Sequence, residues 1–270
     1  MQVFLVFNIL PILYQISFIS VIALVIGSFI SLVSHRIISK EPMVMARSKC
    51  VSCNNPLKAH NLIPILSWVF QRGKCGKCHA KISSRYPLIE LATLLSFLLV
   101  FYANNFELNW LVILEFAIAG TLILMTVVDI EHYFIPDVSQ FFLAILALLT
   151  IFLQPNFDKS LLFFHLKSAI VFLAFIVALM AFFYVFSKEQ GIGVDDLKFF
   201  CVAGLLLGLN HFLLFLMMSG FFGIIFGLIW RKLKKDDTFP FAPSLCLAML
   251  ITMLFGNKID VVDVFGRILL

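Results

Sequence analysis

Long apolar runs separated by short polar segments dominate the chain. Eight such runs lie at roughly 9–34, 88–103, 109–128, 138–154, 161–186, 198–209, 211–230 and 241–256. A membrane-spanning helix needs about 20 mostly apolar residues. The pattern therefore predicts an all-α polytopic membrane protein with about eight transmembrane helices, held in a lipid bilayer.

Two features of the runs limit this count. The pair Asn210-His211 is the only polar break between residues 198 and 230, a stretch too long for one membrane helix and short for two. Six, seven or eight spans are therefore compatible with the pattern. The first run has neither the positively charged start nor the small-residue cleavage site of a removable signal peptide, so we expect it to stay as a helix.

The composition agrees with a membrane protein, because 62% of the residues are hydrophobic and only 13% are charged. In soluble proteins about 45–50% of the residues are hydrophobic and about 25% are charged. Of the 20 Lys and Arg residues, 16 lie in the segments 35–87, 187–198 and 231–238. Basic loops remain in the cytoplasm, so we expect these segments inside and both termini outside. This asymmetry accounts for the net charge of +5, which gives no reason to expect nucleic acid as a partner.

The polar segment 35–87 interrupts the apolar pattern near the start of the chain. It predicts a small cytoplasmic loop domain inserted between the first two transmembrane helices. We therefore expect the chain to consist of four parts. These are a first transmembrane helix in 1–34, the inserted domain in 35–87, a transmembrane core in 88–256 and a C-terminal tail in 257–270.

The inserted domain contains two pairs of cysteines. The sequences CVSC and CGKC supply Cys50, Cys53, Cys75 and Cys78, a spacing close to that of four-thiolate zinc sites. About fifty residues with few large apolar groups bury little surface, so a metal would supply folding energy. Disulfides or unrelated free thiols are the alternatives, and a reducing cytoplasmic face argues against disulfides. We predict a structural zinc site. His60 and His79 could replace a thiolate, although each is more simply a solvated loop residue.

Two aspartates lie where charge is costly in a membrane protein. Asp129 directly follows the third apolar run, and Asp196 precedes the sixth. Carboxylates at such boundaries are candidates for function, and the eight-helix topology puts both at cytoplasmic helix ends. Two carboxylates that share one proton can act as acid and base on a peptide bond. Other nearby acids have simpler readings: Asp137 could cap the next helix, and Glu90 could pair with a Lys or Arg.

Several stretches, in order along nearly the whole chain, resemble the type IV prepilin peptidases, which are intramembrane aspartic proteases with a Gly-x-Gly-Asp signature. They are GSFISLVSHRI, the two cysteine pairs flanking NLIPILSWVFQRGKC, and then SRYPLIE, DIEHYFIPD, GIGVDDLK and PFAPSL. The resemblance implies an endopeptidase of the bacterial inner membrane that removes the leader of type IV prepilins or pseudopilins at the cytoplasmic face. An enzyme of this kind would serve either a pilus or type II secretion.

The resemblance also implies roles for particular residues. Asp129 and Asp196 match the two catalytic aspartates, and the four cysteines match the cytoplasmic tetracysteine motif. Many family members also methylate the new amino terminus, using S-adenosylmethionine as cofactor. No residue of this sequence is assigned to that cofactor, because the chain has no glycine-rich nucleotide motif of the soluble kind.

One position departs from the family pattern. The signature appears as Gly193-Val194-Asp195-Asp196, so aspartate replaces the second glycine. We expect Asp195 to point to the cytoplasm with Lys198 or Lys188 close enough to offset its charge. Asp195→Asn should then change cleavage little, and Asp195→Gly should restore the family loop and quicken cleavage. The departure keeps open a non-proteolytic family member that binds or methylates pseudopilins. Apart from the resemblance, an ion-coupled transporter that uses Asp129, Asp196 and Glu115 is a second alternative.

Overall fold

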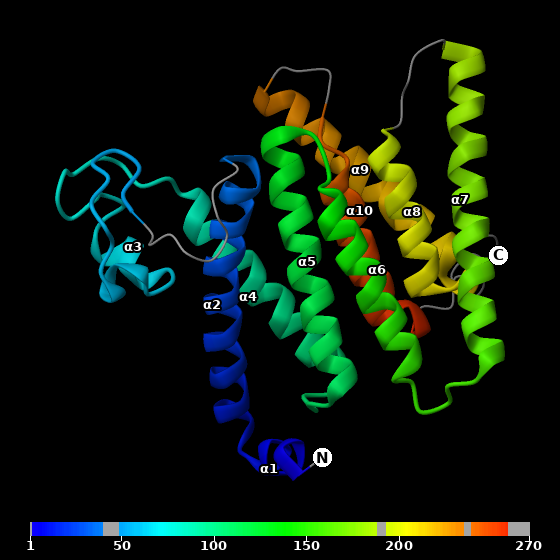
Figure 1. Ribbon diagram of the computed structural model, residues 1–270, viewed down its shortest axis with the longest axis horizontal. Helices are drawn as coiled ribbons and strands as arrows, with labels where there is room; N and C mark the ends of the chain where they lie inside the picture. Colours follow the sequence, from blue (N-terminus) through cyan, green and yellow to red (C-terminus); the bar gives the residue numbers. More distant parts are fainter. Residues whose placement is uncertain (1, 40–48, 188–192, 235–238, 259–270) are drawn as a thin grey trace, which may run out of the picture. The chain divides into compact units, whose positions relative to one another are not determined.

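The computed structural model describes residues 2–39, 49–187, 193–234 and 239–258. These ranges contain helices and turns but no extended strand, and two isolated β-bridges occur in them. The chain divides into two compact units, Met1–Val112 and Ile113–Leu270. They are described separately below (Figure 1).

The first unit begins with a break between two helices. α1 (Gln2–Ile9) and α2 (Ile12–Ser39) are separated by Leu10 and Pro11, because proline lacks the N–H that would continue a helix. The side-chain amide of Gln15 donates to main-chain carbonyl oxygens at the end of α1, which gives that helix end hydrogen-bond partners. The predicted first span is thus two helices, and α2 continues past the expected end at residue 34.

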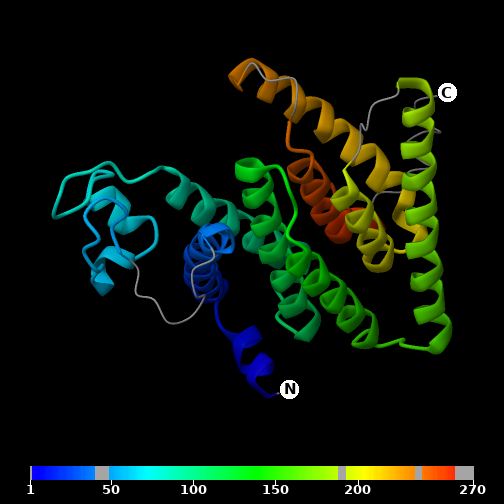
Figure 2. The same cartoon turned by 45° about the horizontal axis from the view of Figure 1, so that its top comes forward.

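α2 packs against α4 (Arg85–Ala103), and the two lie side by side in both ribbon views (Figures 1 and 2). Gly27 makes this approach possible, since a Cβ at this position would lie 2.8 Å from the Cα of Glu90. Near the other end of the contact, the guanidinium of Arg85 donates to the hydroxyl of Ser34 at 2.7 Å. The same guanidinium donates a longer bond to the carbonyl of Ser31 at 3.4 Å. Small residues and polar contacts therefore hold these two helices together.

The described part of the segment between α2 and α4 contains little helix. It includes a 3-10 turn, η1 (Ala59–Leu62), and one short helix, α3 (Leu66–Phe70). The indole N–H of Trp68 donates to the carbonyl of Ile82 at 3.2 Å. The backbone N–H of Ile65, the residue before α3, donates to a carboxylate oxygen of Glu90 at 2.7 Å. This last contact ties the inserted segment to α4.

The described residues of the second unit form six longer helices and two short 3-10 turns. In chain order the elements are α5 (Trp110–His132, which begins at the boundary between the units), α6 (Asp137–Phe152), α7 (Lys159–Ser187), α8 (Val194–Leu207), η2 (Leu209–His211), α9 (Phe212–Lys234), α10 (Ala242–Phe255) and η3 (Gly256–Lys258). The short turn η2 follows Gly208, whose φ is +71°, and coincides with the predicted break at Asn210-His211. Glycine adopts this φ without strain.

Close helix packing in the second unit depends on small residues. α7 packs on α8, where a Cβ at Gly204 would lie 2.8 Å from the backbone of Ala169. α6 also contacts α8, and α9 contacts α10. Large buried side chains such as Phe172, Phe199 and Phe215 fill the space between these helices. The C-terminal end of α5 and the first turns of α6, α8 and α10 lie at the same upper end of this unit in Figure 1.

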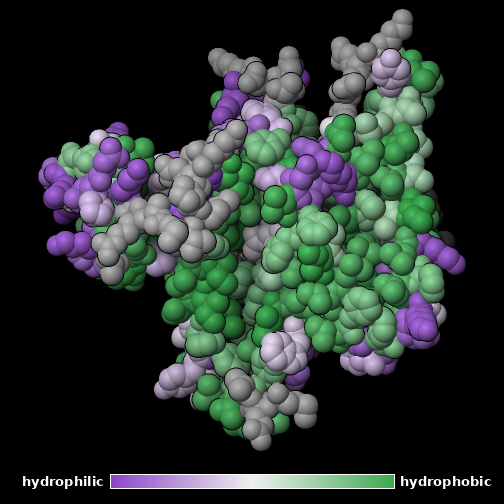
Figure 3. All heavy atoms as spheres, viewed as in Figure 1, coloured by the Kyte–Doolittle hydropathy of each residue, from purple (hydrophilic) through white to green (hydrophobic). Residues whose placement is uncertain are grey.

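All eight predicted apolar runs are helical, which confirms the all-α fold class. Five helical stretches are long and apolar enough to cross a membrane, namely Ile12–Ile37, Arg85–Ala103, Trp110–His132, Lys159–Phe186 and Leu209–Lys234. Asp137–Phe152 and Ala242–Lys258 are shorter apolar helices. On the face drawn in Figure 3, hydrophilic residues gather on the segment between α2 and α4, whereas apolar residues cover the sides of the helices.

Candidate functional site

Asp129 lies in the last turn of α5 and is buried. Its Oδ2 accepts the backbone N–H of Ala242, the first residue of α10, at 2.8 Å. This N–H has no partner within its own helix, and the positive end of the helix dipole favours a carboxylate there. The contact alone could be structural, as a cap supplied by a distant residue. It also fixes the direction in which the Asp129 carboxylate points.

Asp196 occupies the third position of α8 and is half-buried. Its Oδ2 accepts the backbone N–H of Gly193, the N-cap residue, at 3.2 Å. A carboxylate at the third helical position often accepts the backbone N–H of the N-cap residue, which stabilises the start of the helix. Asp196 therefore has a structural task in the first turn of α8, in addition to any chemical one.

The fold brings these two carboxylates together. Ile135, six residues after Asp129, donates its backbone N–H to Asp195, the residue before Asp196. Asp129 is in the last turn of α5 and Asp196 is in the first turn of α8, and these two helix ends lie at the same upper side of the second unit in Figure 1. The two predicted catalytic residues thus share one region of the second unit.

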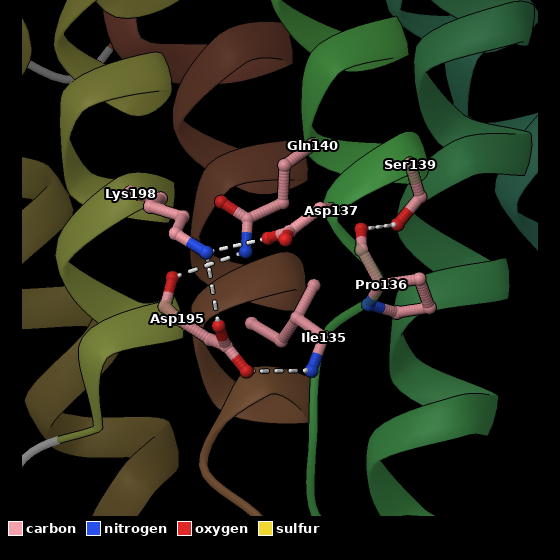
Figure 4. Close-up of polar contacts among 7 residues, drawn as sticks. All are labelled: Ile135, Pro136, Asp137, Ser139, Gln140, Asp195 and Lys198. Carbon is pink, nitrogen blue, oxygen red and sulfur yellow. Dashed lines mark hydrogen bonds and ion pairs between the residues drawn. The ribbon is translucent and has the colours of Figure 1, made fainter.

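Asp195 joins a separate set of polar contacts, drawn in Figure 4. Its Oδ2 accepts the backbone N–H of Ile135 at 3.3 Å, and its Oδ1 lies 3.5 Å from the Nζ of Lys198. The same Nζ lies 2.5 Å from Oδ1 of Asp137. The side-chain amide of Gln140 donates to the main-chain oxygen of Asp195 at 3.2 Å. These contacts connect the first turn of α8 to the turn between α5 and α6 and to α6 itself.

The contacts bear on two expectations about these residues. The side chain of Asp195, which was expected to point to the cytoplasm, is 34% exposed and accepts the backbone N–H of Ile135. Lys198 lies near it, as expected, and Lys188 lies outside the described residues. Asp137 was expected to cap α6. It is instead the first helical residue, after the N-cap Pro136, and its carboxylate pairs with Lys198.

A groove of about 460 Å³ runs along α9 beside this region. Its lining residues are Gly220, Gly223, Ile224, Gly227, Leu228, Arg231, Phe239 and Phe241. Phe241 immediately precedes Ala242, the donor to Asp129. A Cβ at Gly223 would lie 2.9 Å from the Phe241 ring, whereas one at Gly220 would meet nothing within 4 Å. The position of Phe241, and with it the start of α10, therefore depends on Gly223.

The four cysteines of the inserted segment come together in the first unit. The sulfur atoms of Cys50, Cys53, Cys75 and Cys78 all lie within 4.8 Å of one another. Two similar turns produce this cluster. In one, the N–H of Cys50 donates to the carbonyl of Asn55, and in the other the N–H of Cys75 donates to that of Ala80, each at 2.9 Å. The residue after the second cysteine of each turn has a positive φ, 52° at Asn54 and 57° at His79.

The cluster fits a tetrahedral metal ion. Zn–S bonds of about 2.3 Å imply S–S separations of about 3.8 Å, and the sulfurs of Cys50 and Cys78 are 3.9 Å apart. The backbone N–H groups of Cys78 and Lys77 lower the pKa of the Cys75 thiol to about 6. The Ala80 N–H likewise lowers the pKa of the Cys78 thiol, but burial and the neighbouring thiols outweigh it and raise that pKa to about 11. The Cys78 thiol thus resists ionisation unless a cation is present.

Other residues considered from the sequence do not join these sites. His60 and His79 are exposed and lie outside the thiol cluster. Glu115 is also on α5, but fourteen residues before Asp129, or about 21 Å along the helix axis. Glu90 accepts a backbone N–H from Ile65, where a Lys or Arg partner was expected. The contact between Asp129 and Ala242 was missed, because the PFAPSL motif was recognised but carried no assigned role.

Comparison with protein families defines the class of the chain. Residues 21–104 match the bacterial peptidase A24 N-terminal domain, and this match contains all four cysteines of the cluster. Residues 116–228 match the type IV leader peptidase family, and this second match contains Asp129 and Asp196. Both descriptions denote peptidases.

Individual relatives agree over most of the chain. A protein from Aeromonas salmonicida is 30% identical, covering 93% of this chain and 94% of its own length. A protein from Bacillus subtilis is 29% identical, covering 91% of this chain and 96% of its own length. A protein from Legionella pneumophila is 33% identical, covering 80% of this chain and 75% of its own length. All three are named prepilin leader peptidase/N-methyltransferase. No solved structure matches the chain. The chain belongs to the type IV leader peptidase family.

Proposed function

We propose that this protein is an aspartic endopeptidase that removes the leader peptide of type IV prepilins or pseudopilins. The observation that carries the proposal is the location of Asp129 and Asp196 in one region of the second unit. They are far apart in the sequence, yet the hydrogen bond from Ile135 to Asp195 connects the segments that carry them at one end of the helical bundle. Both lie within the stretch that matches the leader peptidase family.

The chemistry follows from two carboxyl groups that share one proton. The ionised carboxylate removes a proton from a water molecule, and the water oxygen attacks the carbonyl carbon of the scissile peptide bond. The other carboxyl group gives its proton to the carbonyl oxygen. When the tetrahedral intermediate collapses, the C–N bond breaks and the leaving amine nitrogen takes up a proton. Neither aspartate is consumed.

Main-chain donors would orient both carboxyl groups for these steps. The N–H of Ala242 binds Oδ2 of Asp129, and the N–H of Gly193 binds Oδ2 of Asp196. In each case the other oxygen, Oδ1, is the atom that would exchange a proton with water or substrate. A capping role and a catalytic role are therefore compatible for both residues, because they use different oxygens.

The site would face the cytoplasm at the bacterial inner membrane. The segments 35–87, 187–198 and 231–238, which hold 16 of the 20 Lys and Arg residues, would lie on the cytoplasmic side by the positive-inside rule. Asp196 lies within one of them, and α9, whose last turn carries Arg231, Lys232 and Lys234, leads into another. A peptide bond at the boundary of lipid and water would be within reach of such a site.

The thiol cluster would hold a zinc ion in a structural role. All four corners of the tetrahedron would be filled by Cys50, Cys53, Cys75 and Cys78, which leaves no open position for a substrate. When bound, the ion would stabilise the fold of the inserted segment and neutralise part of the thiolate charge.

Methylation of the new amino terminus is a second proposed activity, supported by the names of the relatives. In that reaction the methyl group of S-adenosylmethionine passes to the amine nitrogen, which releases S-adenosylhomocysteine and a proton. The sequence has no glycine-rich nucleotide loop of the soluble kind, so no residue is assigned to the methyl donor.

A cleavage assay tests the proposal. The purified full-length protein in detergent is incubated with a full-length prepilin, and the product is identified by mass spectrometry. We expect a single cut between the leader and the mature sequence. An unchanged substrate would contradict the peptidase function and would favour a non-proteolytic family member, which could still methylate a substrate that is supplied already processed.

The structure gives little support to the transporter alternative. The transporter requires Glu115 to share an ion site with Asp129 and Asp196. The separation of about 21 Å between Glu115 and Asp129 along α5 prevents a common site. Ion-dependent uptake into vesicles containing the protein would revive it.

A further inference from the structure

The departure from the family signature at Asp195 creates contacts that a glycine could not make. The carboxylate of Asp195 accepts the backbone N–H of Ile135 and lies beside the Nζ of Lys198, which also pairs with Asp137. Figure 4 shows Lys198 between these two carboxylates. With glycine at position 195, Ile135 would lose this acceptor and Lys198 would keep only Asp137.

These contacts join the two segments that carry the proposed catalytic pair. Ile135 is six residues after Asp129, in the turn that leaves α5. Asp195 directly precedes Asp196 in the first turn of α8. The hydrogen bond from Ile135 to Asp195 therefore bridges the end of one aspartate-bearing helix and the start of the other. The amide of Gln140, which binds the main-chain oxygen of Asp195, adds a second bridge to the same turn of α8.

Both oxygens of Asp195 are already engaged. Oδ2 faces the N–H of Ile135 and Oδ1 faces Lys198, whereas Asp129 and Asp196 each bind a main-chain donor through Oδ2. The Oδ1 atoms of Asp129 and Asp196 are thus available to water or substrate, whereas both oxygens of Asp195 are occupied by groups of the protein. This difference makes Asp195 a positioning residue and leaves proton transfer to Asp129 and Asp196.

We propose that Asp195 is a positioning residue, which fixes the spacing of Asp129 and Asp196 by clamping the start of α8 to the turn at Ile135. This inference rests on the proposed function of that pair. It reverses the expectation from the sequence that Asp195→Gly quickens cleavage. Glycine would remove the clamp, so the variant is slower.

The test compares three changes in the full-length protein in detergent. Asp195→Ala removes both side-chain contacts, whereas Asp195→Asn retains an oxygen that can accept the N–H of Ile135. Val194→Ala is the matched control, because Val194 is in the same helical turn and its side chain is 65% exposed. For each protein, kcat and KM for prepilin cleavage are measured per folded molecule, and exchange of the Ile135 amide is followed by hydrogen–deuterium exchange.

We expect Asp195→Ala to lower kcat about 10- to 100-fold, because small displacements of reacting groups have effects of that size. Its KM should change by less than about twofold, and the Ile135 amide should exchange about tenfold faster. Asp195→Asn should recover most of kcat and of the protection at Ile135. Val194→Ala should leave all three quantities unchanged.

Several results would overturn the proposal. A normal kcat, or unchanged exchange at Ile135, in Asp195→Ala would show that no clamp acts. If Asp195→Asn were as inactive as Asp195→Ala while Asp196→Asn stayed active, Asp195 itself would be catalytic. Should Asp195→Ala fail to fold, Asp195→Gly takes its place with Val194→Gly as its control, since glycine is the residue that the Gly-x-Gly-Asp signature has there. If the wild-type protein cuts no prepilin, the peptidase proposal fails, and the exchange data alone still decide whether the clamp exists.

Discussion

The backbone N–H of Ala242 donates a 2.8 Å hydrogen bond to Asp129, a residue 113 positions earlier in the chain. The donor is the first residue of α10, and the next residue, Pro243, has no N–H to offer. Asp129 thus receives one directed contact from the start of α10, which sets the orientation of its carboxylate. Anything that displaces the start of α10 should disturb the chemistry at Asp129.

The first prediction concerns the proposed catalytic pair. Asp129→Asn and Asp196→Asn should each abolish leader cleavage, because asparagine retains the shape and the hydrogen bond to the main chain but cannot transfer a proton. Cleavage is followed by gel shift of a prepilin. Asp158→Asn serves as the control, since Asp158 is an exposed acid whose contacts to Lys159 and Ser160 an asparagine can largely reproduce. Cleavage at near wild-type rate by either pair variant would remove that residue from the mechanism.

The second prediction tests the link from α9 to Asp129. A Cβ at Gly223 would lie 2.9 Å from the Phe241 ring, so Gly223→Ala should push this ring and the adjacent Ala242. We expect kcat to fall several-fold and the free energy of unfolding to fall by about 1–3 kcal/mol, as for other overpacked sites. Gly220→Ala, where the new methyl meets open space, should be neutral or slightly stabilising. Equal rates for the two variants would argue against this link.

The third prediction concerns the attachment of the inserted segment to α4. Glu90→Ala leaves the N–H of Ile65 without its acceptor at a half-buried position, which should destabilise the segment by about 1–3 kcal/mol. Limited proteolysis should then cut between residues 49 and 84 faster than in the wild type. Glu90→Gln keeps an acceptor oxygen and should resist proteolysis nearly as well. If Glu90→Ala resists equally, the contact contributes nothing to the attachment.

The fourth prediction concerns metal content. The purified, reduced protein should contain about one zinc ion per chain, because four thiolates complete a closed tetrahedral site. Inductively coupled plasma mass spectrometry measures the zinc content per chain. Replacement of Cys50, Cys53, Cys75 and Cys78 by serine should remove the zinc, whereas Cys201→Ser, at a cysteine of α8 outside the cluster, should retain it. Chelation should loosen residues 49–84, as seen by hydrogen exchange, before it affects the helices of the second unit. Zinc that persists in the fourfold serine variant would place the metal elsewhere.

The helices could be predicted from the sequence because apolar runs of this length have few alternatives. The break near Asn210 was predicted too, since polar residues interrupt the run there. The separate helix α1 was not, because Pro11 lies in a stretch that is apolar on both sides and hydropathy does not register the missing N–H. Spacing alone likewise predicted the thiol cluster, because two-residue gaps between cysteines constrain the turn geometry.

The site was predicted less completely. Asp129 and Asp196 could be selected as costly charges near helix ends, and Asp196 binds the nearby Gly193, but the partner of Asp129 depends on tertiary packing. Ala242 is far from Asp129 in the sequence, and an alanine carries no side-chain signal for a main-chain donor. The contact of Asp195 with Ile135 was not predicted, for a similar reason. Its acceptor role depends on the N–H of Ile135, and a backbone group has no signature in the sequence.

The hydrogen bonding of the two thiol turns leaves the start of the connection between them open to insertion. Each turn closes through its own main-chain bonds, from Cys50 to Asn55 and from Cys75 to Ala80, and the intervening chain contacts the second turn only later, through Trp68 and Gln71. Lengthening a flexible connection is inexpensive, at about 0.6 kcal/mol for each doubling. Between Leu57 and Lys58, ahead of the contacts made by Ile65 and Trp68, the chain should therefore accept an inserted epitope. Such an insertion would turn the loop into an attachment point for a reporter, without altering the ligands of the proposed metal.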